Sequence, residues 1–367
     1  MKKKFIISGG GTGGHIFPAI AIANAIREKH PDAEILFVGA LGRMEMDRVP
    51  AAGYPIKGLP VSGFDRKNLL RNFKVIINFL KSLGLAHRIV KEFQPAVVVG
   101  VGGYASAPVL RVAGAMGIPT LLQEQNSYAG VANRLLAAKA SCICVAYDGM
   151  EKFFPASKII KTGNPVRQDL SDTEPKNTEA YRYFGFSPEI KTLLIIGGSL
   201  GARTINQSVI ARLNELAGSG YQVIWQTGRF YFDDACKSYQ PYKNAAILVT
   251  DFVSRMDYAY AIADLVISRA GAGSIAELCL LGKPVILVPS PNVAEDHQTQ
   301  NALALVNKNA AVLIKDVDAV ENLIPNAIRL LKDENKLSEL SNNIATLAEQ
   351  NSADRIAEEI LKLGKII

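Results

Sequence analysis

The chain has 367 residues, of which 49% are hydrophobic and 20% charged, and its formal net charge is +7. These values suit a globular protein of two or three domains, and so moderate a charge gives no reason to expect a nucleic acid partner. No apolar run approaches the roughly 18 residues that a spanning helix needs. Only three apolar residues lie between the N-terminal lysines and the first glycines, whereas a signal peptide needs about 7 to 15, so we expect a cytoplasmic protein.

The chain opens on a strand, a glycine-rich loop and a helix. The strand is predicted at Lys4–Ser8, and five of the next six residues are glycines. An apolar stripe at helical spacing follows at positions 19, 22, 23 and 26. A turn of this kind lets backbone N–H groups approach an anion at a helix N-terminus, so the loop predicts a phosphate site.

The spacing Gly9-x-Gly11-x-x-Gly14 also matches a dinucleotide fingerprint. That reading demands an acidic residue about 20 positions later, at the end of the second strand, to hold a ribose. The second strand ends in Phe37–Gly42 without one, and Glu45 and Asp47 come only in the next helical pattern. We therefore do not favour a nicotinamide or flavin cofactor.

His15 stands at the first helical turn, directly after the loop. The helix dipole disfavours its protonated form there, and a neutral imidazole can act as a general base. A histidine that only hydrogen-bonds the loop is an equally good interpretation of the sequence alone.

The segment Phe64–Lys91 is basic and amphipathic. It holds seven basic residues and one acid, interleaved with leucines, isoleucines and phenylalanines. Such a segment can rest on an anionic membrane surface, or it can be a core helix with a solvated basic face. Composition alone slightly favours the core helix.

Two further loops follow apolar strands of the first half, at 100–106 and 123–127. The first is again rich in glycine, and the second is the polar cluster QEQNS. Because carboxyl ends of parallel strands meet at one edge of a sheet, both loops should open beside the first glycine loop. A polar cluster that ends a buried strand is hard to explain by packing.

Apolar strands alternate with helical patterns along the whole chain, which predicts an α/β protein with parallel sheets covered on both faces. Residues 5–10 and 193–198 begin the two halves alike. The predicted architecture is therefore two doubly wound domains, at 1–163 and 164–340, with a ligand cleft between them. A helical tail at 341–367 can pack back on the first domain. Beyond Lys4–Ser8, strands are predicted at 34–38, 96–101, 120–123, 142–146, 192–196, 222–226, 246–249, 265–268, 285–288 and 311–314.

The second half offers its own loops after strands. Gly197–Arg203 is one, and Ser268–Glu277 again places small residues at a helix N-terminus, which suits a diphosphate. Glu277, about one turn into that helix, can accept hydrogen bonds from ribose hydroxyls, or it is simply an acid favoured by the helix dipole. A polar cluster at 295–301 follows the strand at 285–288 and can read sugar hydroxyls.

Four cysteines are scattered in apolar contexts, and Cys142 and Cys144 would share one face of a strand. No second pair completes a zinc set, so we expect buried thiols. Asp316 and Asp318 form an acidic pair that precedes a helix, where capping explains them better than a metal site.

Seven motifs taken together resemble the MurG family, bacterial transferases that add N-acetylglucosamine to the lipid-linked muramyl-pentapeptide precursor of peptidoglycan. They are GGGTGGHIFPAIAIA, GVGGYASAP, EQN, TGNPVR, GGSLGAR, SRAGAGSIAE and DHQTQNA, in one order over nearly the whole chain. The resemblance implies a glycosyltransferase-B fold, in which two Rossmann-like domains face a cleft. It also implies an inverting transfer from UDP-N-acetylglucosamine to the acceptor 4-hydroxyl, without a metal or other cofactor.

The family's site residues carry over by position. His15 matches the candidate general base, and Glu124 and Asn126 stand beside it as catalytic candidates. Residues that match the acceptor diphosphate site are Gly13, Gly14, Gly102, Gly103 and Tyr104. Residues that match substrate-binding positions, chiefly for the donor, are Thr12, Gly13, Gly14, Asn126, Arg167, Ser199, Val253, Ala272, Gly273, Ser274, Ile275, Glu277 and Gln298.

The chain departs from the family pattern at three points. Gln123 stands where many members have histidine, which removes one alternative base. Leu200 replaces a common glutamine, and His297–Gln298 stands where others have two glutamines, so fine details of the donor contacts differ.

The resemblance also implies the partners and the place of action. They are UDP-N-acetylglucosamine, the lipid-linked acceptor, an anionic membrane surface reached through residues 64–91, and proteins of cell-wall synthesis. The protein would then lie peripherally on the cytoplasmic face of the cell membrane. The competing functions are a UDP-N-acetylglucosamine 2-epimerase, which shares fold and donor, and a non-catalytic sensor of UDP-sugars.

Overall fold

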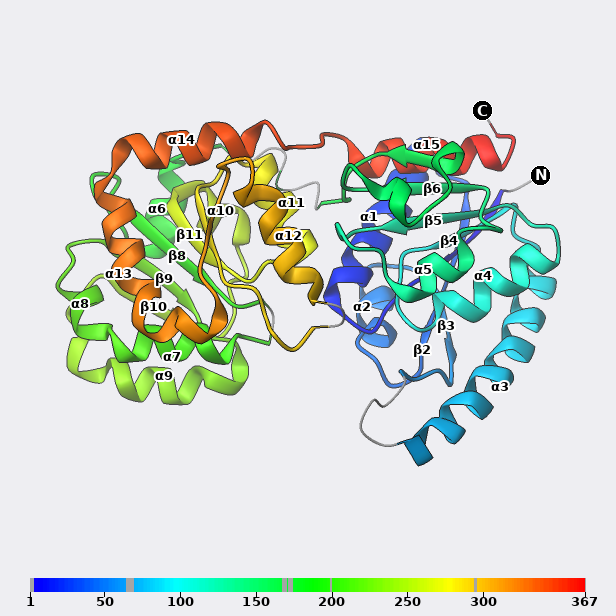
Figure 1. Cartoon of the computed structure of the whole chain (residues 1–367), viewed down its shortest axis with the longest axis horizontal. Helices are drawn as coiled ribbons and strands as arrows, with labels where there is room; N and C mark the ends of the chain where they lie inside the picture. The colour runs from blue at the N-terminus through cyan, green and yellow to red at the C-terminus, as the bar shows by residue number, and fades with distance from the viewer. Residues whose placement is uncertain are drawn as a thin grey trace. The chain divides into compact units, whose positions relative to one another are not determined.

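A computed structural model describes residues 3–63, 69–166, 170, 174–198, 200–293 and 296–366, with the backbone alone at 69–72 and 74. The chain forms two compact units, Met1–Arg167 with Glu349–Ile367, and Gln168–Ala348 (Figure 1). The chain therefore returns to the first unit for its last helix.

The first unit is built on a parallel sheet that, among the described residues, has seven strands in the order β3-β2-β1-β4-β5-β6-β7. Each strand pairs in parallel with its neighbours. The strands are β1 (Lys4–Ser8), β2 (Glu34–Ala40), β3 (Ile56–Leu59), β4 (Val97–Gly100), β5 (Thr120–Glu124), β6 (Cys142–Val145) and β7 (Ile159–Lys161). The helices are α1 (Gly13–Lys29), α2 (Glu45–Ala51), α3 (Leu69–Phe93), α4 (Ser106–Ala115), α5 (Val131–Leu136) and α15 (Ser352–Leu363).

The two faces of this sheet carry separate apolar clusters because successive strand residues point to opposite sides. Phe5 and Ile7 belong to the cluster that contains side chains of α1 and α15. Ile6, between them, belongs to the cluster that contains side chains of α3 and α4. Burial on both faces is why the strands are apolar throughout. Helix α15 lies along α1 in Figure 1 and contributes Ile356 and Ile360, both fully buried.

The second unit repeats the plan with a parallel sheet that, in its described part, has the order β10-β9-β8-β11-β12-β13. Its strands are β8 (Thr192–Ile196), β9 (Gln222–Gln226), β10 (Ile247–Thr250), β11 (Ala263–Ser268), β12 (Val285–Leu287) and β13 (Val312–Leu313). Its helices are α6 (Thr178–Phe184), α7 (Arg203–Ala211), α8 (Leu213–Ala217), α9 (Phe232–Tyr239), α10 (Met256–Ile262), α11 (Ala272–Leu280), α12 (His297–Val306), α13 (Ala319–Lys332) and α14 (Glu334–Ala345), with a 3-10 turn η7 at Asp316–Asp318.

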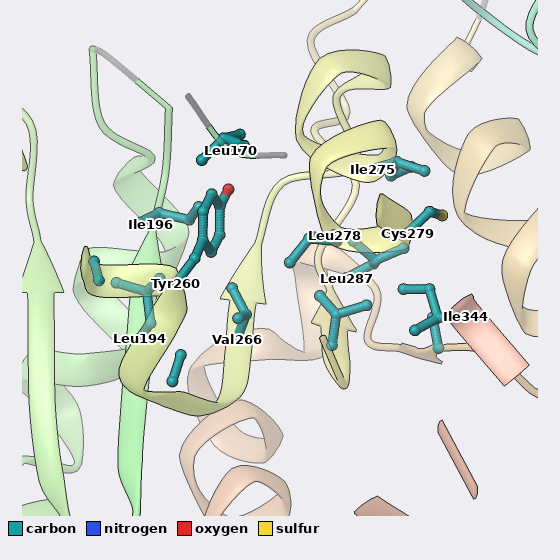
Figure 2. Close-up of a cluster of buried hydrophobic side chains, with 14 of the residues drawn as sticks. Leu170, Leu194, Ile196, Tyr260, Val266, Ile275, Leu278, Cys279, Leu287 and Ile344 are labelled. Carbon is teal, nitrogen blue, oxygen red and sulfur yellow. The ribbon is translucent and has the colours of Figure 1, made fainter. Parts of the chain in front are cut away.

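The likeness between the two halves of the sequence is therefore a likeness of fold. Strand β8 holds the same place in its sheet as β1 in the first, between the strand that follows it in the chain and the fourth strand of its half. Leu194 and Ile196 enter one cluster of the second core, which Figure 2 shows, while Leu193 and Ile195 enter the other. The prediction of two doubly wound parallel-sheet domains is confirmed.

The polar stretch from Asn164 to Lys191, with three prolines, has the composition of a linker between domains, but helix α6 lies inside it. Ala180 and Tyr181 of that helix are buried in the second core. Its composition misleads because a short amphipathic helix needs few apolar residues to cover one side of a sheet.

Candidate functional site

Three loops of the first unit lie at one edge of the sheet, at the carboxyl ends of adjacent strands. Strands β1, β4 and β5 end at Ser8, Gly100 and Glu124 and pair side by side. The buried hydroxyl of Ser106 lies 2.8 Å from the carbonyl oxygen of Ser8 and 2.9 Å from that of Gly102, and can donate to either. The expectation that the loops after these strands open beside one another is confirmed.

Two glycines of the second loop are required by close approach to the first. Gly103 has φ +87°, and a Cβ there would come within 2.3 Å of the carbonyl oxygen of Gly10. Gly102 has φ +97°, and a Cβ there would meet the imidazole of His15 at 2.7 Å. Only glycine combines this backbone conformation with so little space, so the two loops pack on each other through these positions.

The imidazole of His15 is oriented by the glycine loop. Its Nδ1 lies 3.1 Å from the carbonyl oxygen of Gly10 and 3.4 Å from the hydroxyl of Thr12. A carbonyl can only accept, so the hydrogen bond to Gly10 assigns the proton to Nδ1. The lone pair is then on Nε2, the atom that would have to take a proton in general base catalysis.

The sequence did not predict that Glu45 lies against the glycine loop. It is fully buried as the first residue of α2, and its carboxylate accepts hydrogen bonds from the backbone N–H of Gly11 at 2.9 Å and of Ala40 at 3.0 Å. A Cβ on Gly10 would come within 2.1 Å of Oε1 of Glu45. Since this carboxylate already binds the loop from inside the protein, the dinucleotide fingerprint has no acid for a ribose.

Glu124 organises the loop that carries Asn126. One carboxylate oxygen accepts from the backbone and the side-chain amide of Asn126, at 3.1 and 3.3 Å. The other accepts from the backbone N–H of Gly130 at 3.0 Å and from the amide of Asn133 at 2.9 Å. With four donors and 2% exposure, this carboxylate is placed to fix the loop and the side chain of Asn126.

Gln123 and Gln125 join a buried amide network with Asn164. The Gln123 amide donates to Asn164 at 3.1 Å, and the Asn164 amide donates to the carbonyl oxygen of Gln125 at 2.9 Å. The Gln125 amide also donates to the carbonyl oxygen of Val101 at 2.7 Å and contacts the oxygen of the Gln123 side chain. The polar cluster is thus partly structural, because it joins the strand ends of the first sheet to Asn164.

The other predicted residues of the first unit are accessible. Gly13 and Gly14 begin helix α1, and Thr12 is exposed at its N-cap position. Tyr104 is 55% exposed, and a Cβ on Gly63 would meet its phenol oxygen at 2.3 Å. These residues and His15 lie on the two glycine loops, where an anionic ligand can meet backbone N–H groups.

In the second unit, helix α11 begins directly after β11 with a loop of small residues. Its N-cap is Gly271, and Ala272, Gly273 and Ser274 in its first turn are partly exposed, while Ile275 is buried. The first N–H groups of a helix have no intrahelical acceptor, and no acidic side chain lies in this first turn. Together with the helix dipole this makes the turn suitable for a diphosphate.

Glu277 follows one turn later and is held by a buried tyrosine. The hydroxyl of Tyr260, from α10, donates to Oε2 of Glu277 at 2.9 Å. Tyr260 is 1% exposed, and Figure 2 shows its ring among the apolar side chains of the second core. Sequence reasoning missed Tyr260, since nothing in the pattern of α10 distinguishes it from a core residue.

The remaining predicted donor residues are distributed around the same sheet edge. Val253 follows β10 and is 5% exposed. The side-chain oxygen of Gln298, in α12, accepts from the backbone N–H of Ser290 at 2.8 Å and so supports the loop after β12. Arg167 and Ser199 lie outside the described residues.

An ion pair that sequence reasoning also missed joins the loops of this edge. Arg269 donates to Asp316 at 2.5 Å and to the carbonyl oxygens of Val288 and Pro289 at 3.0 and 3.1 Å. Asp316 also accepts from the hydroxyl of Thr204 at 2.9 Å. Capping does not describe these aspartates, because Asp318 stands at the N-cap of α13 without a side-chain cap bond.

The cysteines are free, and three of the four are buried. Burial raises the pKa of the Cys279 thiol to about 12. In the described parts of the chain, no group of three or more His, Cys, Asp or Glu side chains is placed to hold a metal ion. No helix found there has both the length and the apolar character required to span a membrane.

Comparison with known families gives two matches that together cover most of the chain. Residues 5–145 match the glycosyltransferase family 28 N-terminal domain, and residues 192–360 match the C-terminal domain of the same family. The two matches fall on the two sheets described above.

Individual proteins that are similar to this chain support the same family. The chain is 63% identical, over 99% of its length and 98% of the relative's, to the UDP-N-acetylglucosamine–N-acetylmuramyl-(pentapeptide) pyrophosphoryl-undecaprenol N-acetylglucosamine transferase of Parabacteroides distasonis. Among solved structures it is similar to Acinetobacter baumannii MurG, with a TM-score of 0.80 and 27% identity over 99% and 100% of the two chains. The UDP-GlcNAc 2-epimerase of Neisseria meningitidis has a TM-score of 0.68 at 16% identity over 99% and 100% of the chains, which is a likeness of fold alone.

Proposed function

The chain belongs to glycosyltransferase family 28, and we propose that it transfers N-acetylglucosamine from UDP-N-acetylglucosamine to the lipid-linked muramyl-pentapeptide acceptor in peptidoglycan synthesis. The observation that carries this conclusion is the 63% identity, over nearly the full length of both chains, to a transferase whose name states that reaction. The epimerase alternative is not favoured, because it rests on a shared fold at low identity.

The first unit supplies the acceptor-activating group in this proposal. Nε2 of His15 takes the proton of the acceptor 4-hydroxyl while the oxygen attacks the anomeric carbon. The bond between that carbon and the UDP oxygen breaks, UDP leaves with the electron pair, and the configuration inverts. The bond from Nδ1 to the carbonyl oxygen of Gly10 supports this assignment because it leaves the basic lone pair on Nε2.

The second unit holds the donor and the departing charge. The first turn of α11 presents backbone N–H groups of Ala272, Gly273 and Ser274 to the diphosphate, and Glu277 accepts from the ribose hydroxyls. Negative charge grows on the UDP as its bond to the sugar breaks, and donors that are already in place stabilise it without reorganisation. Val253, Gln298, Arg167 and Ser199 are assigned to the donor by their match to the family's positions.

No metal or other cofactor is part of the proposed chemistry. Support comes from Asp316, which together with Asp318 has the DxD spacing that metal-dependent sugar transferases use to bind a cation. It is already engaged by Arg269 and Thr204. The helix dipole and N–H groups of α11 would stabilise the leaving group in place of a cation.

An anionic membrane surface is the proposed site of action, on the cytoplasmic face of the cell membrane. Helix α3 has two apolar stripes. Ala86, Ile89 and Val90 are buried against the first core. Phe73, Ile76, Ile77 and Leu80, at helical spacing, are exposed, and Lys81, Arg88 and Lys91 are exposed on the same helix. An exposed apolar stripe with cations suits a lipid headgroup region. The predicted basic side chains at positions 66, 67, 71 and 74 lie outside the part of the chain that the structure describes.

The test is transfer of radiolabelled N-acetylglucosamine from its UDP donor to a short-chain lipid analogue of the acceptor, with and without a chelator. We expect a labelled lipid product at the same rate in both. Labelled N-acetylmannosamine formed without acceptor would instead identify an epimerase. Donor binding with no product of either kind would identify a sensor.

A further inference from the structure

The mechanism above gives no role to Glu45, an ionisable side chain that is fully buried in the first unit. Glu45 lies between the ends of β1 and β2, where Gly10 and Gly39 leave room for it, since a Cβ on either would come within 2.6 Å of its side chain. Both groups that it meets at hydrogen-bond distance, the N–H of Gly11 and the N–H of Ala40, are donors. An ionised carboxylate fits two donors, and the N-terminus of α2 favours its negative charge.

The hydrogen bonds of Glu45 and of His15 meet on a single peptide group. The carbonyl of Gly10 accepts from Nδ1 of His15 at 3.1 Å, and the N–H of the same peptide, which belongs to Gly11, donates to Glu45 at 2.9 Å. We propose that Glu45 is a positioning residue that acts on His15 through the peptide between Gly10 and Gly11. This inference rests on the function proposed above, in which His15 is the general base.

The physical reason is polarisation along the chain of hydrogen bonds. A carboxylate that accepts from the peptide N–H increases the negative charge on the carbonyl oxygen of that peptide, and hydrogen bonds in such chains strengthen one another. Gly10 then becomes a better acceptor for Nδ1–H, which fixes the tautomer of His15. When Nε2 takes the proton of the acceptor hydroxyl, the imidazolium that forms is stabilised by the same bond. No proton is transferred to Glu45 in this scheme.

The arrangement resembles in logic the triads in which a carboxylate holds a catalytic imidazole in the correct tautomer. Here one peptide group stands between the two side chains. This arrangement explains why positions 10 and 103 are glycines. The peptide of Gly10 packs against Glu45 on one side and against Gly103 on the other, so a side chain on Gly10 or Gly103 would push these groups apart.

A double-mutant cycle separates this role from simple support of the loop. The variants are Glu45→Gln, His15→Ala and their combination, with Asp47→Asn as the control because Asp47 is exposed on the same helix. We expect Glu45→Gln to lower kcat by about 10- to 100-fold, as loss of the partner of a functional histidine does in metal enzymes, with little change in donor KM. In single-turnover measurements on the His15→Ala background the same change should have almost no effect.

An equal loss of rate in both backgrounds would overturn the proposal, because Glu45 would then support the loop without acting through His15. Glu45→Asp, which keeps the charge but shortens the side chain, should give an intermediate rate. It also provides the comparison should Glu45→Gln not fold.

Nitrogen-resolved NMR of the native chain tests the geometry without any transfer activity. The chain has four histidines, so His15 is assigned by comparison with the His15→Ala variant. We expect the Nδ1–H tautomer, with a downfield Nδ1 proton that moves upfield in Glu45→Gln. An Nε2–H tautomer in the native chain would refute the relay. A native chain with the expected tautomer but no transfer would instead point to failure of the proposed function.

Discussion

The hydroxyl of Tyr260 lies 2.9 Å from Oε2 of Glu277 and donates a hydrogen bond to the carboxylate that our proposal assigns to the donor ribose. Because Tyr260 is buried, its oxygen is fixed and limits the positions that the carboxylate can take. Tyr260→Phe should therefore raise the donor KM about tenfold, since a hydrogen bond to a charged group contributes about 1.5–3 kcal/mol. Steady-state kinetics with UDP-N-acetylglucosamine measure this change.

The control for that prediction is a donor that lacks the ribose 2′-hydroxyl. The native enzyme should discriminate against it, and Tyr260→Phe should reduce the discrimination because Glu277 is no longer held in place. If KM rises equally for both donors, Tyr260 serves the packing of the core and not the position of Glu277.

Gly103 should tolerate no side chain. In Gly103→Ala the methyl group would come within 2.3 Å of the carbonyl oxygen of Gly10, at φ +87°. The loop must shift and withdraw the acceptor of His15, so kcat should fall by more than tenfold, in addition to a backbone strain of about 1–3 kcal/mol. Gly117→Ala is the matched control, because Gly117 has φ +73° but no neighbour within 4 Å of the added Cβ. Similar kinetics for the two variants would contradict this prediction.

The parts of the fold that sequence predicted well are those fixed by local pattern. Strands β1, β8 and β9 have the predicted bounds, because each is a short apolar run that begins or ends beside glycine or polar residues. Strands β3 and β7 were not predicted. They are edge strands of four and three residues, IKGL and IIK, and are only partly buried. An edge strand needs little apolar surface, so its signal is weak.

The candidate site was likewise predictable from the sequence only in part. The loops could be placed at one edge because the order of strands and glycines determines it. The contacts of Glu45, Tyr260 and Asp316 could not, because each joins elements whose proximity arises only from tertiary packing. Glu45 illustrates this best, since its carboxylate turns back from α2 to a loop 34 residues earlier in the chain.

The ion pair of Arg269 and Asp316 should be strongly coupled. Both side chains are mostly buried, and Arg269 also holds two carbonyl oxygens at the end of β12. Asp316→Ala should destabilise the second unit by about 2–4 kcal/mol, since it leaves a cation without its partner in a poorly hydrated place. The double variant Arg269→Met with Asp316→Ala should lose less than the sum of the single losses.

Urea unfolding followed by tryptophan fluorescence measures this coupling. The chain has one tryptophan, Trp225, which is fully buried in the second unit and therefore reports on that unit. Strictly additive losses would show that the two side chains act independently.

Helix α3 should determine binding to anionic vesicles. Phe73→Ser with Leu80→Ser removes two exposed apolar side chains, 71% and 60% accessible, and should lower the fraction that sediments with anionic phospholipid vesicles several-fold. Charge reversal at Arg66, Lys67, Arg71 and Lys74 should act in the same direction and more strongly at low salt. Val317→Ser is the control, because Val317 is 85% exposed in the second unit. Unchanged sedimentation of both α3 variants would exclude this helix as the docking surface.

Lys283 should make the stability of the second unit depend on pH. Burial, with repulsion from Lys176, lowers its pKa from 10.5 to about 8, although Asp264 opposes the shift. Below pH 8 the lysine is protonated in both the folded and the unfolded chain, and the folded state bears the full cost of the buried charge. Between pH 8 and 10.5 the unfolded chain binds more protons than the folded one, so the free energy of unfolding should rise with pH.

The comparison that isolates this effect is Lys283→Met. Its absolute stability also reflects the lost hydrogen bond to the carbonyl oxygen of Ala263, so the informative quantity is how the difference from the native chain changes with pH. From pH 7 to 10.5 the native chain should gain about 3 kcal/mol relative to the variant, measured by urea unfolding with Trp225 fluorescence. Lys243→Met, at an exposed lysine, should give no such trend. A pH-independent difference between the native chain and Lys283→Met would mean that Lys283 keeps an ordinary pKa in the folded protein.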